Sequence, residues 1–158
     1  MEYMNNLTER KYIMSGGHFD YQQLWLNEIA NELEQLIMRA GREIPRKEIE
    51  SEWYGYYQNC YDDCIVTKNY PDYDLQTIAI MKRAVYVMRL AYIYAQRIDW
   101  LLSGDDGEDD LQERLKEELA ELRSKYPSGK FTFNRNKVQY DEDSSCWREI
   151  SDNEDKNT

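Results

Sequence analysis

The chain has 158 residues and carries 31 acidic against 20 basic side chains, a formal net charge of −11 at neutral pH. A chain of this length builds one hydrophobic core and leaves little room for a second domain. The negative charge all but excludes a free-standing module that grips a nucleic-acid backbone, because such a module needs a basic surface.

Membrane spans and secretory leaders are not expected either. The longest apolar runs, such as 78–81 and 100–102, are far shorter than the ~20 residues that a membrane-spanning helix needs. No charged segment leads into an apolar one at the N-terminus, so we expect the chain in the cytoplasm of the cell that produces it.

Cysteine usage predicts neither disulfides nor a metal. The thiols at Cys60, Cys64 and Cys146 are odd in number, and reduced thiols are the default in the cytoplasm. Cys60 and Cys64 could supply half of a zinc site, but a structural zinc takes four Cys or His ligands and His18 is the only histidine. We therefore expect no metal and no cofactor.

The N-terminal part predicts an arm followed by a helix. Residues 1–14 are polar and lack a sustained period, so we interpret them as an arm that precedes a helical bundle domain over 15–126. Paired glycines and Asp20 are typical of a helix start, and apolar residues then recur at spacings of three and four as far as Ala40. Gly41 is placed to end this helix.

The stretch from 42 to 74 is rich in tyrosine. Pro45 fits the first turn of another helix, and we expect one or two short helices packed over the longer ones. Aromatic side chains that could anchor a protein interface are Trp53, Tyr54, Tyr57 and Tyr61. Packing on the bundle explains these aromatics equally well. Base stacking is disfavoured because the neighbouring charges are acidic.

The strongest helical pattern runs from Leu75 to Leu102. One apolar seam comprises Ile78, Met81, Val85, Met88, Tyr92 and Ala95, and a second seam beside it comprises Ala84, Val87, Ala91, Tyr94, Ile98 and Leu101. The polar remainder is a narrow basic stripe formed by Lys82, Arg89, Gln96 and Arg97. A helix that is apolar around most of its circumference is expected at the centre of a bundle.

A third helix is predicted over Asp109–Lys125, after Gly104 ends the central one. Leu111, Leu115, Leu119 and Leu122 line its inner side. Its outer side carries the acidic candidates for partner binding, Glu113, Glu117 and Glu121. Beyond it we expect a possible small β-hairpin over 127–140, with its turn at 134–136. An acidic tail over 141–158 is expected to be disordered.

Two segments, SGGHFDYQQ at 15–23 and YAQRIDWLLSGDDGEDD at 94–110, resemble the signatures of a family of small proteins found in phages, prophages and bacteria. The resemblance covers about half of the chain and leaves out 42–73 and the tail beyond Lys125. It implies a mobile-element context and brings no activity with it. Short acidic proteins in that context often act by binding host or competitor machinery.

Candidate functional residues in the two signature loops are His18, Asp20, Arg97, Asp99, Asp105 and Asp106. A lone histidine titrates near neutrality, but no Ser or Cys pairs with His18 in the pattern. We favour structure over catalysis, with Asp20 as an N-cap and Asp99 bonded to His18 or to the glycine amides. Asp105 and Asp106 are contiguous, unlike the alternating ligands of an EF-hand, so a solvated helix start is favoured over a Mg²⁺ or Ca²⁺ site.

A formal match to a magnesium pattern also occurs. Residues 117–121 read EExxE and 149–152 read ExxD, which resembles the ligand pattern of all-helical nucleotide pyrophosphohydrolases. Those carboxylates must converge from two packed helices. The second element lies in an acidic tail that is poor in apolar residues, so this enzyme class is an alternative and not the favoured interpretation.

The sequence favours a mainly α-helical, non-enzymatic interaction protein. Our hypothesis is a phage or mobile-element inhibitor of host defence that binds a protein target, possessing an acidic surface that could occupy a basic nucleic-acid channel, as DNA mimics and some anti-CRISPR proteins do. The same surface also serves solubility. Besides the metal-dependent hydrolase, a second alternative is a binder that sequesters a nucleotide signal, with Arg89, Arg97 and the paired glycines as phosphate contacts.

Overall fold

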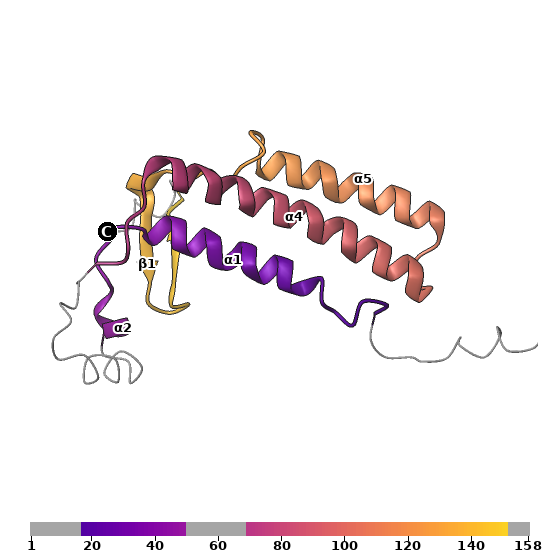
Figure 1. Ribbon diagram of the computed structural model, residues 1–158, viewed down its shortest axis with the longest axis horizontal. Coiled ribbons are helices and arrows are strands. Elements are labelled where there is room, and N and C mark those ends of the chain that lie inside the picture. The colour runs from indigo at the N-terminus through magenta and orange to yellow at the C-terminus, as the bar shows by residue number, and fades with distance from the viewer. Residues whose placement is uncertain (1–16, 50–68, 152–158) are drawn as a thin grey trace, which may run out of the picture.

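Three long helices lie side by side in the computed structural model, with α4 between α1 and α5 (Figure 1). The structure describes residues 17–49 and 69–151. The long helices are α1 (Leu24–Arg39), α4 (Leu75–Ser103) and α5 (Glu108–Lys125), and the short α2 covers Arg46–Ile49. A single helical turn, η1 (Arg135–Lys137), precedes the strands β1 (Val138–Asp141) and β2 (Cys146–Glu149). The predicted mainly helical bundle with a small hairpin is confirmed.

The first helix begins later than the sequence indicates. The prediction that Asp20 is the N-cap is wrong, because Asp20 and Tyr21 have left-handed backbone conformations with φ of 52° and 60°, and α1 starts only at Leu24. The residues before it form tight turns, in which the Asp20 amide donates to the Gly17 carbonyl. The end of α1 is as predicted, since Gly41 follows it with φ of 69°.

Both ends of α4 are closed by their own sequence. The Asp74 carboxylate accepts a 2.6 Å hydrogen bond from the Thr77 amide, which lowers the Asp74 pKa. At the other end Gly104 has φ of 80°, and its amide donates to the Leu101 carbonyl. The observed bounds differ from the predicted Leu75–Leu102 by one residue.

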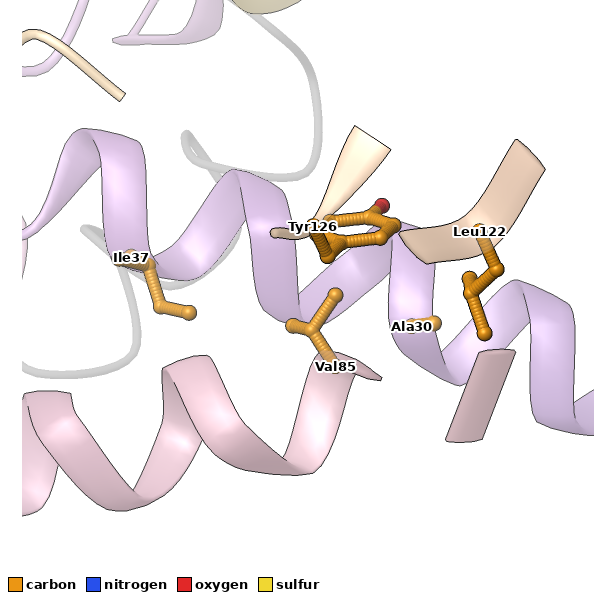
Figure 2. Packing of buried hydrophobic residues seen from close by; sticks show 5 residues of the cluster. All are labelled: Ala30, Ile37, Val85, Leu122 and Tyr126. Atoms are coloured by element: carbon orange, nitrogen blue, oxygen red, sulfur yellow. The ribbon is translucent and has the colours of Figure 1, made fainter. Parts of the chain in front are cut away.

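The main core lies where the three long helices meet. Ala30 and Ile37 of α1, Val85 of α4, and Leu122 and Tyr126 at the end of α5 form one buried cluster (Figure 2). Val85 belongs to the first predicted seam and points from α4 toward α1 and the Tyr126 ring. This seam is therefore the one by which α4 packs against α1.

The hairpin lies later in the chain than predicted. Tyr140 of β1 pairs with Trp147 of β2, so the strands span 138–149 and the expectations of a hairpin over 127–140 and of disorder from 141 are wrong for these residues. Trp147 is buried, and its backbone amide and carbonyl are both bonded to the Gln35 side chain of α1, at 2.7 and 2.9 Å. The Asp141 carboxylate accepts from the Asp143 amide and closes the turn. These contacts outweigh the local acidic composition.

The helices can also be compared with the length and apolar character of a membrane-spanning helix. Within 17–49 and 69–151, no helix combines the length and the apolar character that crossing a bilayer requires.

Candidate functional site

The two signature loops meet at Asp99. Its side chain is 1% exposed, and its Oδ1 accepts a 2.7 Å hydrogen bond from the Phe19 amide while Oδ2 accepts from Gln23 Nε2 at 3.2 Å. The His18 amide donates instead to Ser103 Oγ at 3.0 Å. Asp99 thus ties the turn before α1 to the last turns of α4. Among the described residues its amide partner is Phe19 and not the expected His18 or Gly17, and Gly16 lies outside them.

A glycine is needed at position 17 for this contact. A Cβ on Gly17 would overlap the Asp99 carboxylate, so no other residue fits without displacing it. The carboxylate therefore occupies the space that a phosphate would need at this glycine. The His18 ring is exposed and packs edge-on against Phe19 at 5.2 Å between ring centroids. Asp20 is also exposed.

Arg97 and Asp106 form a buried ion pair beside Asp99. Arg97 Nη1 lies 3.1 Å from Asp106 Oδ2, and Arg97 Nη2 lies 3.2 Å from Glu118 Oε1 of α5. Arg114 Nη1 approaches the other Asp106 oxygen at 2.7 Å, and the Arg97 guanidinium stacks 4.1 Å from the Trp100 ring centre. Asp106 was expected in a solvated helix start. It is buried instead, because two arginines satisfy its carboxylate.

Arg97 also lines a groove of about 590 Å³ between α1, α4 and α5. Its lining includes Asn27 and Asn31 of α1, Arg89, Gln96 and Trp100 of α4, and Tyr126. Arg89 donates to the side-chain oxygens of Asn27 and Asn31 and pairs with Glu34 at 3.2 Å. The groove is therefore polar and built from both charges.

Tyr126 also lines this groove, and its phenol is less acidic than that of a free tyrosine. Its hydroxyl donates a 2.6 Å hydrogen bond to Glu34 Oε1. Burial and this bond to a carboxylate raise the Tyr126 pKa to about 12. The protonated phenol is thus the form that the fold holds.

The magnesium pattern is not assembled in the described residues. Glu118 pairs with Arg97, and Glu149 lies on strand β2, where its carboxylate accepts from the Asn134 amide at 2.9 Å. The pattern needs its second set of carboxylates on a helix that faces the first, so Glu149 does not fit it. No cluster of three or more His, Cys, Asp or Glu side chains suited to a metal occurs within 17–49 and 69–151. Asp152 lies outside these ranges.

The predicted partner-binding residues fall into two groups. Glu113, Glu117 and Glu121 are exposed on α5, one turn apart along the helix. Trp53, Tyr54, Tyr57 and Tyr61 lie outside the described residues, as does the arm at 1–14. Asp105 is exposed after the end of α4 and takes no part in the Arg97 ion pairs. Of the two groups, only the three glutamates therefore have a described position, on the exposed side of α5.

Sequence reasoning missed an exposed apolar surface on α4. Ile80 is 64% exposed, Val87 47% and Leu102 52%, and Trp25 on neighbouring α1 is 65% exposed. The signal was present in the second seam of the central helix, which we assigned to the bundle interior. The structure buries Arg97 of the basic stripe, half-buries its other members, and leaves Val87, Ala91, Tyr94 and Ile98 of the second seam exposed.

Comparison of the chain with protein-family models, with curated proteins and with solved structures finds no match.

Proposed function

We propose that the chain is a non-enzymatic interaction protein that acts by binding a protein partner through the acidic outer side of α5. The observation that carries this proposal is the row of exposed glutamates at positions 113, 117 and 121. Like charges four residues apart on a helix destabilise it by a few tenths of a kcal/mol per pair. Lys116 and Lys125 stand near Glu113 and Glu121 and offset part of this repulsion, so the proposal rests on the exposure and spacing of the three glutamates.

The finer proposal concerns the kind of partner. A stripe of carboxylates is complementary to the basic channel of a nucleic-acid-binding protein, and charge complementarity of this kind accelerates encounter. Together with the mobile-element context implied by the signature loops, this supports an inhibitor of a host defence protein, encoded by a phage or another mobile element and acting in the bacterial cytoplasm. The partner would be a protein, with no direct contact between this chain and nucleic acid.

Capture from a bacterial lysate tests this proposal. The bait is the whole chain, compared with Glu113→Gln/Glu117→Gln/Glu121→Gln and with a matched control, Glu28→Gln/Glu32→Gln/Glu142→Gln, which removes the same charge from exposed positions elsewhere. We expect a protein that is recovered with wild type and with the control, is lost with the α5 variant, and is released by rising salt. Equal recovery with both triple variants would contradict the role of α5.

The groove favours a second candidate, a binder of a nucleotide signal. Arg89 and Arg97 both line it, and the buried Nε atoms of both have no hydrogen-bond partner within the described parts of the chain. Trp100 and Tyr92 add aromatic faces to the same groove. Thermal unfolding with and without a panel of cyclic and linear nucleotides tests this candidate. A nucleotide that raises the melting temperature of wild type and not of Arg89→Gln supports it, and no shift with any nucleotide contradicts it.

A further inference from the structure

The exposed side of α4 carries a regular apolar seam. It comprises Ile80, Ala84, Val87, Ala91, Tyr94 and Ile98, which we name the outer seam. Its members follow one another at spacings of 4, 3, 4, 3 and 4, the repeat by which a helix packs against another helix in a coiled coil. It extends for about 27 Å along α4. Such a repeat predicts a helical occupant.

The outer seam lies on the opposite side of the helix layer from the groove. Val87, Ala91 and Ile98 each precede a groove-lining residue of α4 by two positions, which is a rotation of about 200° around a helix. On α1, Trp25 and Ile29 precede the groove residues Asn27 and Asn31 by the same two positions. The exposed apolar side chains of both helices therefore share one face of the layer.

The area of this face fits a stable interface. Ile80, Val87, Tyr94, Ile98 and Leu102 on α4, with Trp25 and Ile29 on α1, are each between 40% and 65% exposed. Such fractions leave on the order of 100 Å² of each large side chain in water, so α4 alone presents on the order of 500 Å² and the whole face on the order of 700 Å², against ~800 Å² per partner in a standard interface. Single monomers seldom expose a larger continuous apolar patch.

Charge selects the occupant. The chain has a net charge of −11, yet no Asp, Glu, Lys or Arg occurs in the outer seam. Two copies can therefore bring the α4 seams together without placing like charges directly opposite one another along α4, whereas the acidic side of α5 would repel its own copy. On α1 the exposed Glu28 and Glu32 flank Trp25 and Ile29, so contact is favoured along α4 and not along α1.

Side-chain size makes the seam complementary to itself. In an antiparallel pair with its two-fold axis at Ala91, Ala84 of each copy lies opposite Ile98 of the other. Each of these two contacts sets a small side chain against a larger one, and the central alanines allow close approach of the two helices. A parallel pair would instead stack alanine on alanine and tyrosine on tyrosine.

We propose that the outer seam is the interface of a homodimer, in which α4 of one copy packs antiparallel against α4 of a second copy about Ala91. The dimer leaves both acidic α5 stripes and both grooves uncovered, so it goes beyond the proposed function and does not depend on it. Its two copies would present a partner with two binding stripes.

Sedimentation equilibrium of the whole chain over the micromolar to 100 micromolar range tests the dimer. We expect a species of twice the 19.1 kDa chain mass. Ala91→Glu should shift the chain to the monomer mass, because it places two carboxylates at the axis. Its matched control, Ala120→Glu, makes the same change at an exposed position of α5 and should leave the dimer intact.

Other outcomes overturn the proposal. A monomer mass for wild type at every concentration contradicts it without any variant, whether the seam is bare or covered by another part of the chain. A dimer that survives Ala91→Glu also contradicts it, since its interface lies elsewhere. If Ala91→Glu fails to fold by circular dichroism, Ala84→Cys/Ile98→Cys replaces it, with the native cysteines changed to serine. Oxidation should then link two copies through positions 84 and 98, and absence of that link overturns the antiparallel interface.

Discussion

On α4 a charged side chain is buried on one side of the helix, while large apolar side chains are exposed to solvent on the other. Arg97, on the side that faces α1 and α5, is only 5% exposed, whereas Ile80 of the outer seam is 64% exposed. Arginine tolerates burial here because Asp106 and Glu118 pair with it. An apolar side chain has no such local compensation in water. Ion pairing thus allows a charged side chain to be buried on one side of α4, while the apolar side chains of the outer seam have no neighbour that covers them within the described residues.

Removing the buried charge pair should have the largest effect. Arg97→Ala leaves the Asp106 carboxylate buried with Arg114 as its remaining cation, and we expect a loss of roughly 3–5 kcal/mol in the free energy of unfolding. Denaturant unfolding monitored by circular dichroism measures it. The double variant Arg97→Met/Asp106→Leu removes both charges and should recover part of the loss. A loss below 1 kcal/mol in Arg97→Ala would show that this side of α4 does not depend on the pair.

A pair of identical substitutions compares the two sides directly. Val85 is fully buried in the core cluster, so Val85→Ala should cost roughly 2–3 kcal/mol through lost burial and a residual cavity. Val87→Ala, two residues further on, should change the stability of the isolated monomer by less than about 0.5 kcal/mol. Chemical denaturation at low protein concentration gives both values. Equal losses would mean that the outer seam is covered within the monomer.

The contact between the signature loops should have a smaller effect. Asp99→Ala leaves the Phe19 amide and the Gln23 side chain unpaired, at a cost of roughly 1–3 kcal/mol. Asp99→Asn keeps an oxygen for the Phe19 amide and should cost less. Thermal unfolding compares the two. Unchanged unfolding in Asp99→Ala would assign Asp99 to binding instead of structure.

The smallest effect concerns alkaline pH. The Tyr126 pKa is raised from about 10 to about 12, so its contribution to stability is complete below pH 10 and is lost as the pH rises toward 12. Wild type should melt higher than Tyr126→Phe at pH 8, because the phenol bonds to Glu34, and this difference should shrink by pH 11. Melting curves at both pH values test it. A difference that grows with pH would contradict the raised pKa.

Sequence patterns predicted the long helices and their ends well, because periodicity and caps are local signals. Asp74, Gly41 and Gly104 act as their residue types indicate. Turns that depend on distant partners were not predictable. Asp20 is not a cap because the loop before α1 is held by Asp99. The two residues of this contact, Phe19 and Asp99, are 80 positions apart, so local sequence patterns do not indicate it. Trp147 orders the second strand through Gln35, which lies 112 positions away.

The site was predicted in part for the same reason. The concentration of Arg97, Asp99 and Asp106 near one helix end was visible in the sequence, but their bonding partners were not, since four elements contribute them. The outer seam was visible as a 4-3 repeat, yet nothing in a single sequence tells which of two apolar seams meets the rest of the chain. Only the packing of α1 and α5 separates the buried seam from the exposed one.

The central claim, that a second copy covers the outer seam, is tested most directly at its proposed axis. Ala91→Cys, with the three native cysteines changed to serine, places one thiol of each copy beside the other. We expect mild oxidation to link most of the Ala91→Cys chains into a disulfide dimer, while the matched Ala120→Cys variant on α5 stays monomeric under the same conditions. A thiol at position 91 that reacts freely with a maleimide reagent, and links no more often than the one at position 120, would contradict it.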